Sequence, residues 1–229
     1  MPHVIASQED WLAARRQLLA KEKAFTRMRD ALNQERLALP WMKVTKSYTF
    51  QSADGPVTLA DLFDGRSQLA IKHFMFGPDW SDGCVGCSHE IDNISGALVH
   101  LNHHDVSYVA VARAPIERLE AFRRRMGWDV RFVSSYGSDF NYDFHVSFTP
   151  EEVARGEAFY NFGMQKIGSD ELSGRSVFYR DAAGDIFHTY SSFARGGELH
   201  LASYAMLDIM PKGRNETVNG DLTDWVRLH

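Results

Sequence analysis

The chain has 229 residues, with 25 Lys and Arg against 30 Asp and Glu, so its formal net charge is −5. This charge excludes the basic surplus that is typical of proteins that bind nucleic acid or anionic lipid. Hydrophobic residues make up 44% and charged residues 24%, which is ordinary for a globular protein and argues against disorder. The apolar stretches fall far short of the ~18 residues of a membrane span, and the first residues lack the layout of a signal peptide. We therefore expect a cytoplasmic protein.

Residues 1–46 predict a long amphipathic helix followed by a linker. Ser7 and Asp10 form an N-terminal capping pattern, and the charged stretch after them ends before Pro40. Apolar residues recur in this stretch at every seventh position, namely Trp11, Leu18, Phe25 and Leu32. We expect this narrow stripe to dock on the rest of the chain or on a partner subunit, and residues 47–229 to form one domain.

Strands and helices alternate through the second part of the chain. This alternation predicts βαβ units and an α/β fold, with a sheet that is covered on both faces. The expected elements are a hairpin around Asp54 and Gly55, a helical turn at 59–63, a buried strand at 69–76, a helix after the cysteines, a strand at 106–112, a helix between Pro115 and Gly127, a strand at 130–135, a hairpin of 176–180 with 186–190, and a last helix at 199–209.

The chain has two cysteines, Cys84 and Cys87, which stand three positions apart. Because they follow a strand and a loop, we expect Cys84 at a helix N-terminus, where free N–H groups and the helix dipole stabilise a thiolate. Cys87, one turn later, is expected to point inward. An attacking thiol followed by a shielded resolving thiol is the arrangement that disulfide exchange requires. Asp79 and Asp82 oppose this activation, because nearby carboxylates raise a thiol pKa.

Two other interpretations of the cysteine pair stay open. The pair supplies half of a zinc site if His89, His103 or His104 completes it, although no second Cys-x-x-Cys is present. The two thiols are otherwise reduced cysteines that pack as small hydrophobic side chains. The redox interpretation is favoured, because a Cys-x-x-Cys within a βαβ pattern is typical of it.

The segment HFMFGPDWSDGCVGCS at 73–88, the text before it from Tyr48, and SVFYRDAAGDIF at 176–187 resemble the thioredoxin superfamily. They resemble in particular a bacterial family of thioredoxin-like, alkyl-hydroperoxide-reductase-like proteins of largely unassigned function. The resemblance implies a thioredoxin-like fold and a substrate-contacting Trp80 before the dithiol. His73 lies nearest to the buried acid of thioredoxins, so it is a candidate for proton transfer with Cys87, and a buried structural histidine is the alternative.

Another part of the resemblance is closer to peroxiredoxins. Those proteins carry an Arg before a similar strand, and Arg175, Phe178 and Asp181 reproduce its R-x-x-F-x-x-D pattern. They also carry Ser or Thr three residues before the reactive cysteine, and Ser81 stands at that position here. Their Pro stands seven residues before that cysteine, whereas Pro78 stands six residues before Cys84. The resemblance therefore implies that Arg175 lies beside the dithiol and lowers the pKa of Cys84.

Residues 136–163 form an expected insertion with eight aromatic side chains in 28 residues, against 12% aromatic residues in the whole chain. Such a density needs a surface to pack on. One interpretation is that the insertion covers the cysteine face, with Tyr136 and Phe140 contacting substrate. The other is an aromatic satellite core far from the thiols.

The sequence therefore predicts an α/β protein of thioredoxin-like fold, with a central mixed sheet flanked by helices, an extra N-terminal helix and an aromatic-rich insertion. Its predicted function is thiol-disulfide oxidoreductase through Cys84 and Cys87, with no metal and no cofactor. Alternatives are a peroxide reductase supported by Arg175 and a non-catalytic binding protein. The expected partners are a small disulfide or peroxide and an external thiol reductant, with no nucleic acid and no membrane, and a homodimer is the candidate assembly.

Overall fold

The computed structural model describes residues 3–216, 223 and 225–229. It divides into two compact units, of which one is built on helix α1 (Gln8–Leu37) and the other is formed by Trp41–His229. Ser7 begins α1 as predicted, because its side chain accepts the backbone N–H of Asp10 at 3.1 Å. The four side chains of the apolar stripe are all exposed. The docking of this stripe on the rest of the chain or on a partner subunit stays a prediction.

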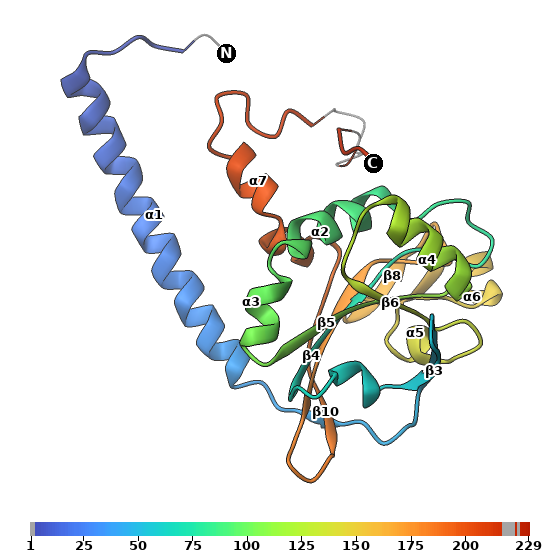
Figure 1. Ribbon diagram of the computed structural model, residues 1–229. Helices are drawn as coiled ribbons and strands as arrows, with labels where there is room; N and C mark the ends of the chain where they lie inside the picture. The colour runs from blue at the N-terminus through green and yellow to red at the C-terminus, as the bar shows by residue number, and fades with distance from the viewer. Residues whose placement is uncertain (1–2, 217–222, 224) are drawn as a thin grey trace. The chain divides into compact units, whose positions relative to one another are not determined.

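The second unit is built on a mixed sheet (Figure 1). Within the described residues the sheet has eight strands, in the order β1-β10-β9-β4-β5-β6-β2-β3. The strands are β1 (Met42–Lys43), β2 (Thr49–Ser52), β3 (Gly55–Thr58), β4 (Gln68–His73), β5 (Val106–Ala112), β6 (Arg131–Ser134), β9 (Gly174–Arg180) and β10 (Ile186–Phe193), while β7 (Glu157–Tyr160) and β8 (Gly163–Lys166) form a separate hairpin. The helices and turns are η1 (Asp61–Phe63), α2 (Val85–Ser95), α3 (Leu98–His103), α4 (Ile116–Arg125), α5 (Phe140–Asp143), α6 (Pro150–Arg155), η2 (Ala194–His200) and α7 (Ala202–Leu207).

Four neighbouring strands, in the order β10-β9-β4-β5, have thioredoxin-like topology. Strands β4 and β5 run parallel and are connected through α2 and α3, whereas β9 runs antiparallel to β4 and forms a hairpin with β10. The cysteines lie at the start of α2, beyond the carboxyl end of the parallel strand β4, where α/β folds commonly place their functional groups. The predicted fold class, an α/β protein with a central mixed sheet flanked by helices, is confirmed.

The sheet separates two hydrophobic cores, because side chains alternate between its faces along each strand. On one face Leu69 and Ile71 of β4 pack with η1 and α5. On the other face Phe74 packs with Cys87 of α2 and with Phe122 of α4. We call the side of the sheet that packs with η1 the η1 face, and the side that packs with Cys87 the cysteine face.

Two predicted helices differ from those in the structure. The helix after the cysteines is interrupted at Gly96, which ends α2 before α3 begins. The last helix is shorter than the predicted 199–209, since α7 spans Ala202–Leu207 and follows a 3₁₀ segment. The extended Leu201 (φ −99°, ψ 91°) between them breaks the helical path.

The aromatic insertion does not cover the cysteine face with Tyr136 and Phe140, as one of the two interpretations expected. Phe140 is fully buried on the η1 face, where its ring lies 4.9 Å from that of Phe50, so its predicted contact with substrate is wrong. Phe148 and Tyr160 form a satellite core with Phe193. The rings are held there because burial against existing apolar surface removes the cost of their exposure to water. Tyr136 is exposed.

Candidate functional site

A tightly held loop carries the chain from β4 to the first cysteine. The guanidinium of Arg118 donates to the carbonyls of Pro78 and Trp80, at 2.8 and 2.7 Å. The backbone of Gly83 passes the Phe74 ring so closely that a Cβ at this position would lie 2.5 Å from it. The loop therefore enters α2 in one defined position, and the Cys84 N–H donates to the Met75 carbonyl at 2.9 Å.

Cys84 is the N-cap residue of α2, and its thiol is half-buried. Its Sγ accepts the backbone N–H of Cys87 at 3.4 Å. The side chain of Cys87, one turn later, is buried. The sequence therefore predicted both the helix start and the inward direction of Cys87.

The two thiols have opposite pKa shifts. The hydrogen bond from the Cys87 thiol lowers the pKa of Cys84 to about 6; burial opposes this effect, while the Cys87 N–H and the charge of Lys72 add to it. The same hydrogen bond and burial raise the pKa of Cys87 well above its ordinary value. One thiol is therefore a thiolate at neutral pH while its neighbour holds its proton.

Three charged side chains form a cluster on the cysteine face, and two of them, Lys72 and Glu90, are buried. Lys72 is fully buried, and its Nζ lies 2.7 Å from a carboxylate oxygen of Glu90 and 2.8 Å from the hydroxyl of Ser173. Arg175 forms an ion pair with the same Glu90 oxygen. Burial raises the pKa of Glu90, but the charges of Lys72 and Arg175 outweigh it and hold that pKa below its ordinary value. The triad therefore carries a net charge of about +1 at neutral pH, since it has two cations and one carboxylate.

Strand register explains why these charges lie together. Lys72 of β4 and Arg175 of β9 are direct partners across the antiparallel pair, so their side chains point to the same face. That face carries α2, which contributes Glu90. Arg175 therefore lies on the cysteine face, and its contact in the structure is Glu90. Its predicted place beside the dithiol and its effect on the pKa of Cys84 stay predictions.

Sequence reasoning missed Lys72 and Glu90. A signal was present, because Lys72 is a lone charge in the apolar strand around Leu69–Phe76, and Glu90 stands three residues after Cys87 in the helix. A charge at a buried strand position requires a partner. The sequence did not show which partner it would have.

His73 is the residue that we chose instead, and the structure places it on the other side of the sheet. Its ring stacks on Phe144 with centroids 5.9 Å apart, and its Nε2 lies 2.9 Å from the Ser176 hydroxyl. Burial and the charge of Lys72 lower its pKa to about 3. Because adjacent strand residues point to opposite faces, His73 points away from Cys87, and its buried position among aromatic rings is that of the structural histidine that we gave as the alternative.

The other predicted residues lie in the loop before Cys84. Trp80 packs against the cysteine face together with Cys84, and Ser81 is exposed. Asp82, which we expected to oppose activation of Cys84, forms an ion pair with Arg125 at 2.7 Å. This pairing reduces the effect of its charge on the thiol.

The proposed zinc ligands have other neighbours. His89 Nε2 lies 2.6 Å from the Ser203 hydroxyl, and its ring packs edge-on against Trp225. In the described ranges, no group of three His, Cys, Asp or Glu side chains is placed to hold a metal ion. A search of the same ranges finds no helix with the length and apolarity to cross a membrane.

The chain belongs to the family described as "Bacterial protein of unknown function (DUF899)", whose model matches residues 1–229. This confirms the resemblance to a bacterial family without an assigned function. No curated protein sequence matches the chain.

Several solved structures are similar in fold. Peroxidoxin BcpB from Mycobacterium tuberculosis is 12% identical, covers 72% of this chain and 95% of its own, and has a TM-score of 0.45. A peroxiredoxin Q mutant from Xanthomonas campestris is 13% identical over 69% and 90% of the two chains, with a TM-score of 0.46. A putative protein disulfide isomerase from Bacteroides thetaiotaomicron is 16% identical over 77% and 96%, with a TM-score of 0.42. Likeness at this level concerns the backbone and carries no activity with it.

Proposed function

We propose that this family member is a thiol-disulfide oxidoreductase, in which Cys84 attacks and Cys87 resolves. The observation that carries the proposal is the geometry at the start of α2, where the half-buried Cys84 Sγ accepts the N–H of Cys87 at 3.4 Å and the Cys87 thiol lies buried one turn inside. This geometry stabilises a thiolate on the more accessible sulfur and keeps the proton on the buried one. Disulfide exchange needs this asymmetry, because the thiolate is the nucleophile.

The reaction takes two exchange steps. The Cys84 thiolate attacks one sulfur of a disulfide, forms a mixed disulfide and releases the other sulfur as a thiolate. Cys87 then loses its proton and attacks Cys84 Sγ, which forms the Cys84–Cys87 disulfide and releases the second thiolate. The substrate gains two electrons and the pair loses two. An external thiol reverses these steps and restores the dithiol.

The low reactivity of Cys87 is removed by the first step. Its pKa is raised chiefly by its hydrogen bond to Cys84 and by burial, and the charge of Cys84 contributes as well. Once Cys84 is bound in a mixed disulfide, its negative charge is gone and its sulfur is a weak acceptor. The charge of Lys72, which lowers the pKa of Cys87, remains. Cys87 therefore becomes easier to deprotonate at the moment when it must attack.

The experiment compares substrates and traps the intermediate. Reduced protein is mixed in a stopped-flow instrument with a small disulfide, a protein disulfide and hydrogen peroxide, and thiol loss is followed. We expect fast reaction with the small disulfide and trapping of a mixed disulfide on Cys84 in Cys87→Ser. Cys84→Ser, the matched control, should trap nothing.

Each other outcome identifies an alternative. Fast reaction with peroxide alone, with a sulfenic acid on Cys84 in Cys87→Ser, would make the chain a peroxide reductase and assign Arg175 and Ser81 to that reaction. A wild-type Cys84 no more reactive than a free cysteine would indicate a non-catalytic binding protein. Trp80→Ala tests the proposed substrate contact, and we expect slower reaction with the small disulfide at an unchanged Cys84 pKa.

A further inference from the structure

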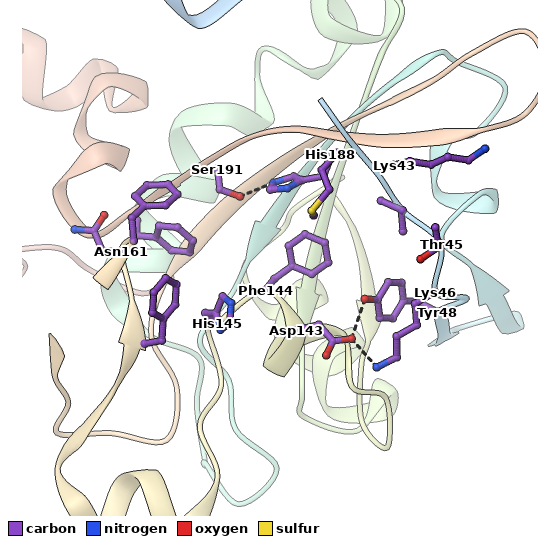
Figure 2. A pocket seen from close by; sticks show the side chains of 15 residues that line it. Lys43, Thr45, Lys46, Tyr48, Asp143, Phe144, His145, Asn161, His188 and Ser191 are labelled. Carbon is purple, nitrogen blue, oxygen red and sulfur yellow. Dashed lines mark hydrogen bonds and ion pairs between the residues drawn. The ribbon is translucent and has the colours of Figure 1, made fainter. Parts of the chain in front are cut away.

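A separate cavity of about 520 Å³ lies on the η1 side of the sheet (Figure 2). Its walls come from four segments of the second unit: 42–48, 143–145, 159–162, and β10 through His188, Ser191 and Phe193. The side chains of His188 and Phe178 are neighbours across the β9–β10 pair, which places His188 on the face opposite to α2. The volume is within the range of about 300–1,000 Å³ that small-molecule sites occupy. Nothing in the proposed disulfide exchange uses this space.

Phenyl rings form much of the cavity wall. Phe144 and Phe193 are largely buried, whereas Phe159 is 42% exposed and Phe162 is 69% exposed. The rings of Phe162 and Phe193 lie 5.3 Å apart and nearly perpendicular to each other. Two rings thus face solvent at the rim of a cavity with an aromatic base, which suits a flat apolar molecule.

A tight turn places one of these rings at the rim. Asn161 and Phe162 are the two central residues of the β7–β8 hairpin, and both have positive φ angles, of 50° and 65°, as two-residue hairpin turns require. A bulky residue such as Phe rarely adopts this left-handed region. The turn leaves most of the Phe162 ring exposed, with its edge against Phe193.

The cations that line the cavity are already paired. Lys46 lies 2.6 Å from Asp143 and 2.8 Å from Asp139, and Lys43 forms an ion pair with Asp185. Figure 2 shows Lys46 and Tyr48 both directed at the Asp143 carboxylate. An anionic ligand would have to compete with these carboxylates, so the cavity favours an uncharged molecule.

His188 supplies a hydrogen-bond acceptor. Its Nε2 lies 3.0 Å from the Tyr190 carbonyl and 2.8 Å from the Ser191 hydroxyl. Because a carbonyl oxygen can only accept, Nε2 carries the proton, and Nδ1 has a free lone pair. Burial lowers the pKa of this histidine, which keeps it neutral. Both of these bonds are to Nε2, and among the described residues none is made by Nδ1.

We propose that this cavity binds an uncharged aromatic molecule that carries a hydroxyl or N–H donor. Its ring packs between the phenyl groups of Phe144, Phe159 and Phe162, and its donor binds His188 Nδ1. The site is independent of the thiols, so its ligand need not be the substrate of Cys84.

The test uses two fluorescent probes, 1-naphthol and 1-methoxynaphthalene, which share a ring system but differ in the donor. We expect 1-naphthol to bind with saturation and 1-methoxynaphthalene to bind about tenfold more weakly, which is about 1.4 kcal/mol. His188→Phe should bring 1-naphthol down to the affinity of 1-methoxynaphthalene and leave the latter unchanged. His100→Phe, on exposed α3, is the matched control.

Phe162→Gly separates binding from folding. Glycine adopts a φ of 65° without strain, so this variant should keep or raise the melting temperature while it weakens both probes by the same factor. Cys84→Ser should bind both probes as the unaltered protein does. The proposal is overturned if neither probe saturates, if the two probes bind equally, or if His188→Phe and Phe162→Gly bind like His100→Phe.

Discussion

Replacing Cys87 by serine and, separately, by alanine isolates the main cause of the low Cys84 pKa. Serine keeps a side-chain donor at this position, whereas alanine removes it. Both variants keep the backbone N–H that Cys84 Sγ accepts, the helix N-terminus and the charge of Lys72. Each variant also has Cys84 as its single cysteine, so a thiol titration reports that group alone.

The size of the effect follows from the strength of the hydrogen bond. A hydrogen bond to a charged group contributes about 1.5–3 kcal/mol, and one pKa unit corresponds to about 1.36 kcal/mol. Loss of the donor should therefore raise the Cys84 pKa by about one to two units above the value of about 6 in the unaltered protein. At neutral pH the thiolate fraction would fall from about 90% to between about 50% and 10%.

The ultraviolet absorbance of the thiolate, followed against pH, measures both pKa values. The rate of alkylation by iodoacetamide at neutral pH provides a second measurement and should fall in the alanine variant by about twofold to tenfold. If both variants titrate at the same pKa, the thiol hydrogen bond is not the cause of activation. The helix N-terminus and Lys72 would then be responsible.

Three further predictions concern charge, pH and packing. Lys72→Met should raise the Cys84 pKa and make the disulfide harder to reduce in a glutathione equilibrium. In denaturant titrations it should lower the free energy of unfolding by less than the about 3–5 kcal/mol of a buried charge left alone, because Glu90 keeps Arg175 as an ion-pair partner. Reduced protein should gain stability over oxidised protein as the pH rises from about 6 toward 9.0, because the folded Cys84 pKa lies below its ordinary 9.0. Above 9.0 the raised pKa of Cys87 reverses this trend. Calorimetry that shows no pH-dependent difference between the two forms would contradict this prediction. Gly83→Ala should destabilise the protein by about 1–3 kcal/mol, since its Cβ would meet the Phe74 ring, whereas the control Gly96→Ala meets no atom within 4 Å and should be close to neutral in thermal melts.

Local signals made most of the fold predictable. Apolar steps of three and four after Cys84 identified α2, and the turn residues between Arg180 and Ile186 identified the β9–β10 hairpin. The interruption at Gly96 was harder to predict, because the apolar pattern continues through it to Leu101. The low helix propensity of glycine favoured this break, but one glycine inside a continuous apolar pattern is often tolerated.

The site was only half predictable, for a reason that concerns two adjacent residues. Lys72 and His73 are neighbours in one strand, so they point to opposite faces, but the sequence does not show which face carries the cysteine helix. The choice of His73 rested on resemblance and put the ionisable partner on the wrong side. The Phe140 expectation was wrong for the same reason, because a residue count cannot tell on which face an insertion packs.

The charges around the dithiol have a consequence for the direction of electron flow. Lys72 and Arg175 bring two positive charges and Glu90 one negative charge into a buried region. A thiolate on Cys84 is the second negative charge, and oxidation to a disulfide removes it. Burial makes an unbalanced charge costly, so reduction of the Cys84–Cys87 disulfide is favoured because the new thiolate balances the second cation. The Cys84–Cys87 disulfide should accordingly accept electrons readily from an external thiol, and Glu90 limits this tendency because it already neutralises one of the two cations.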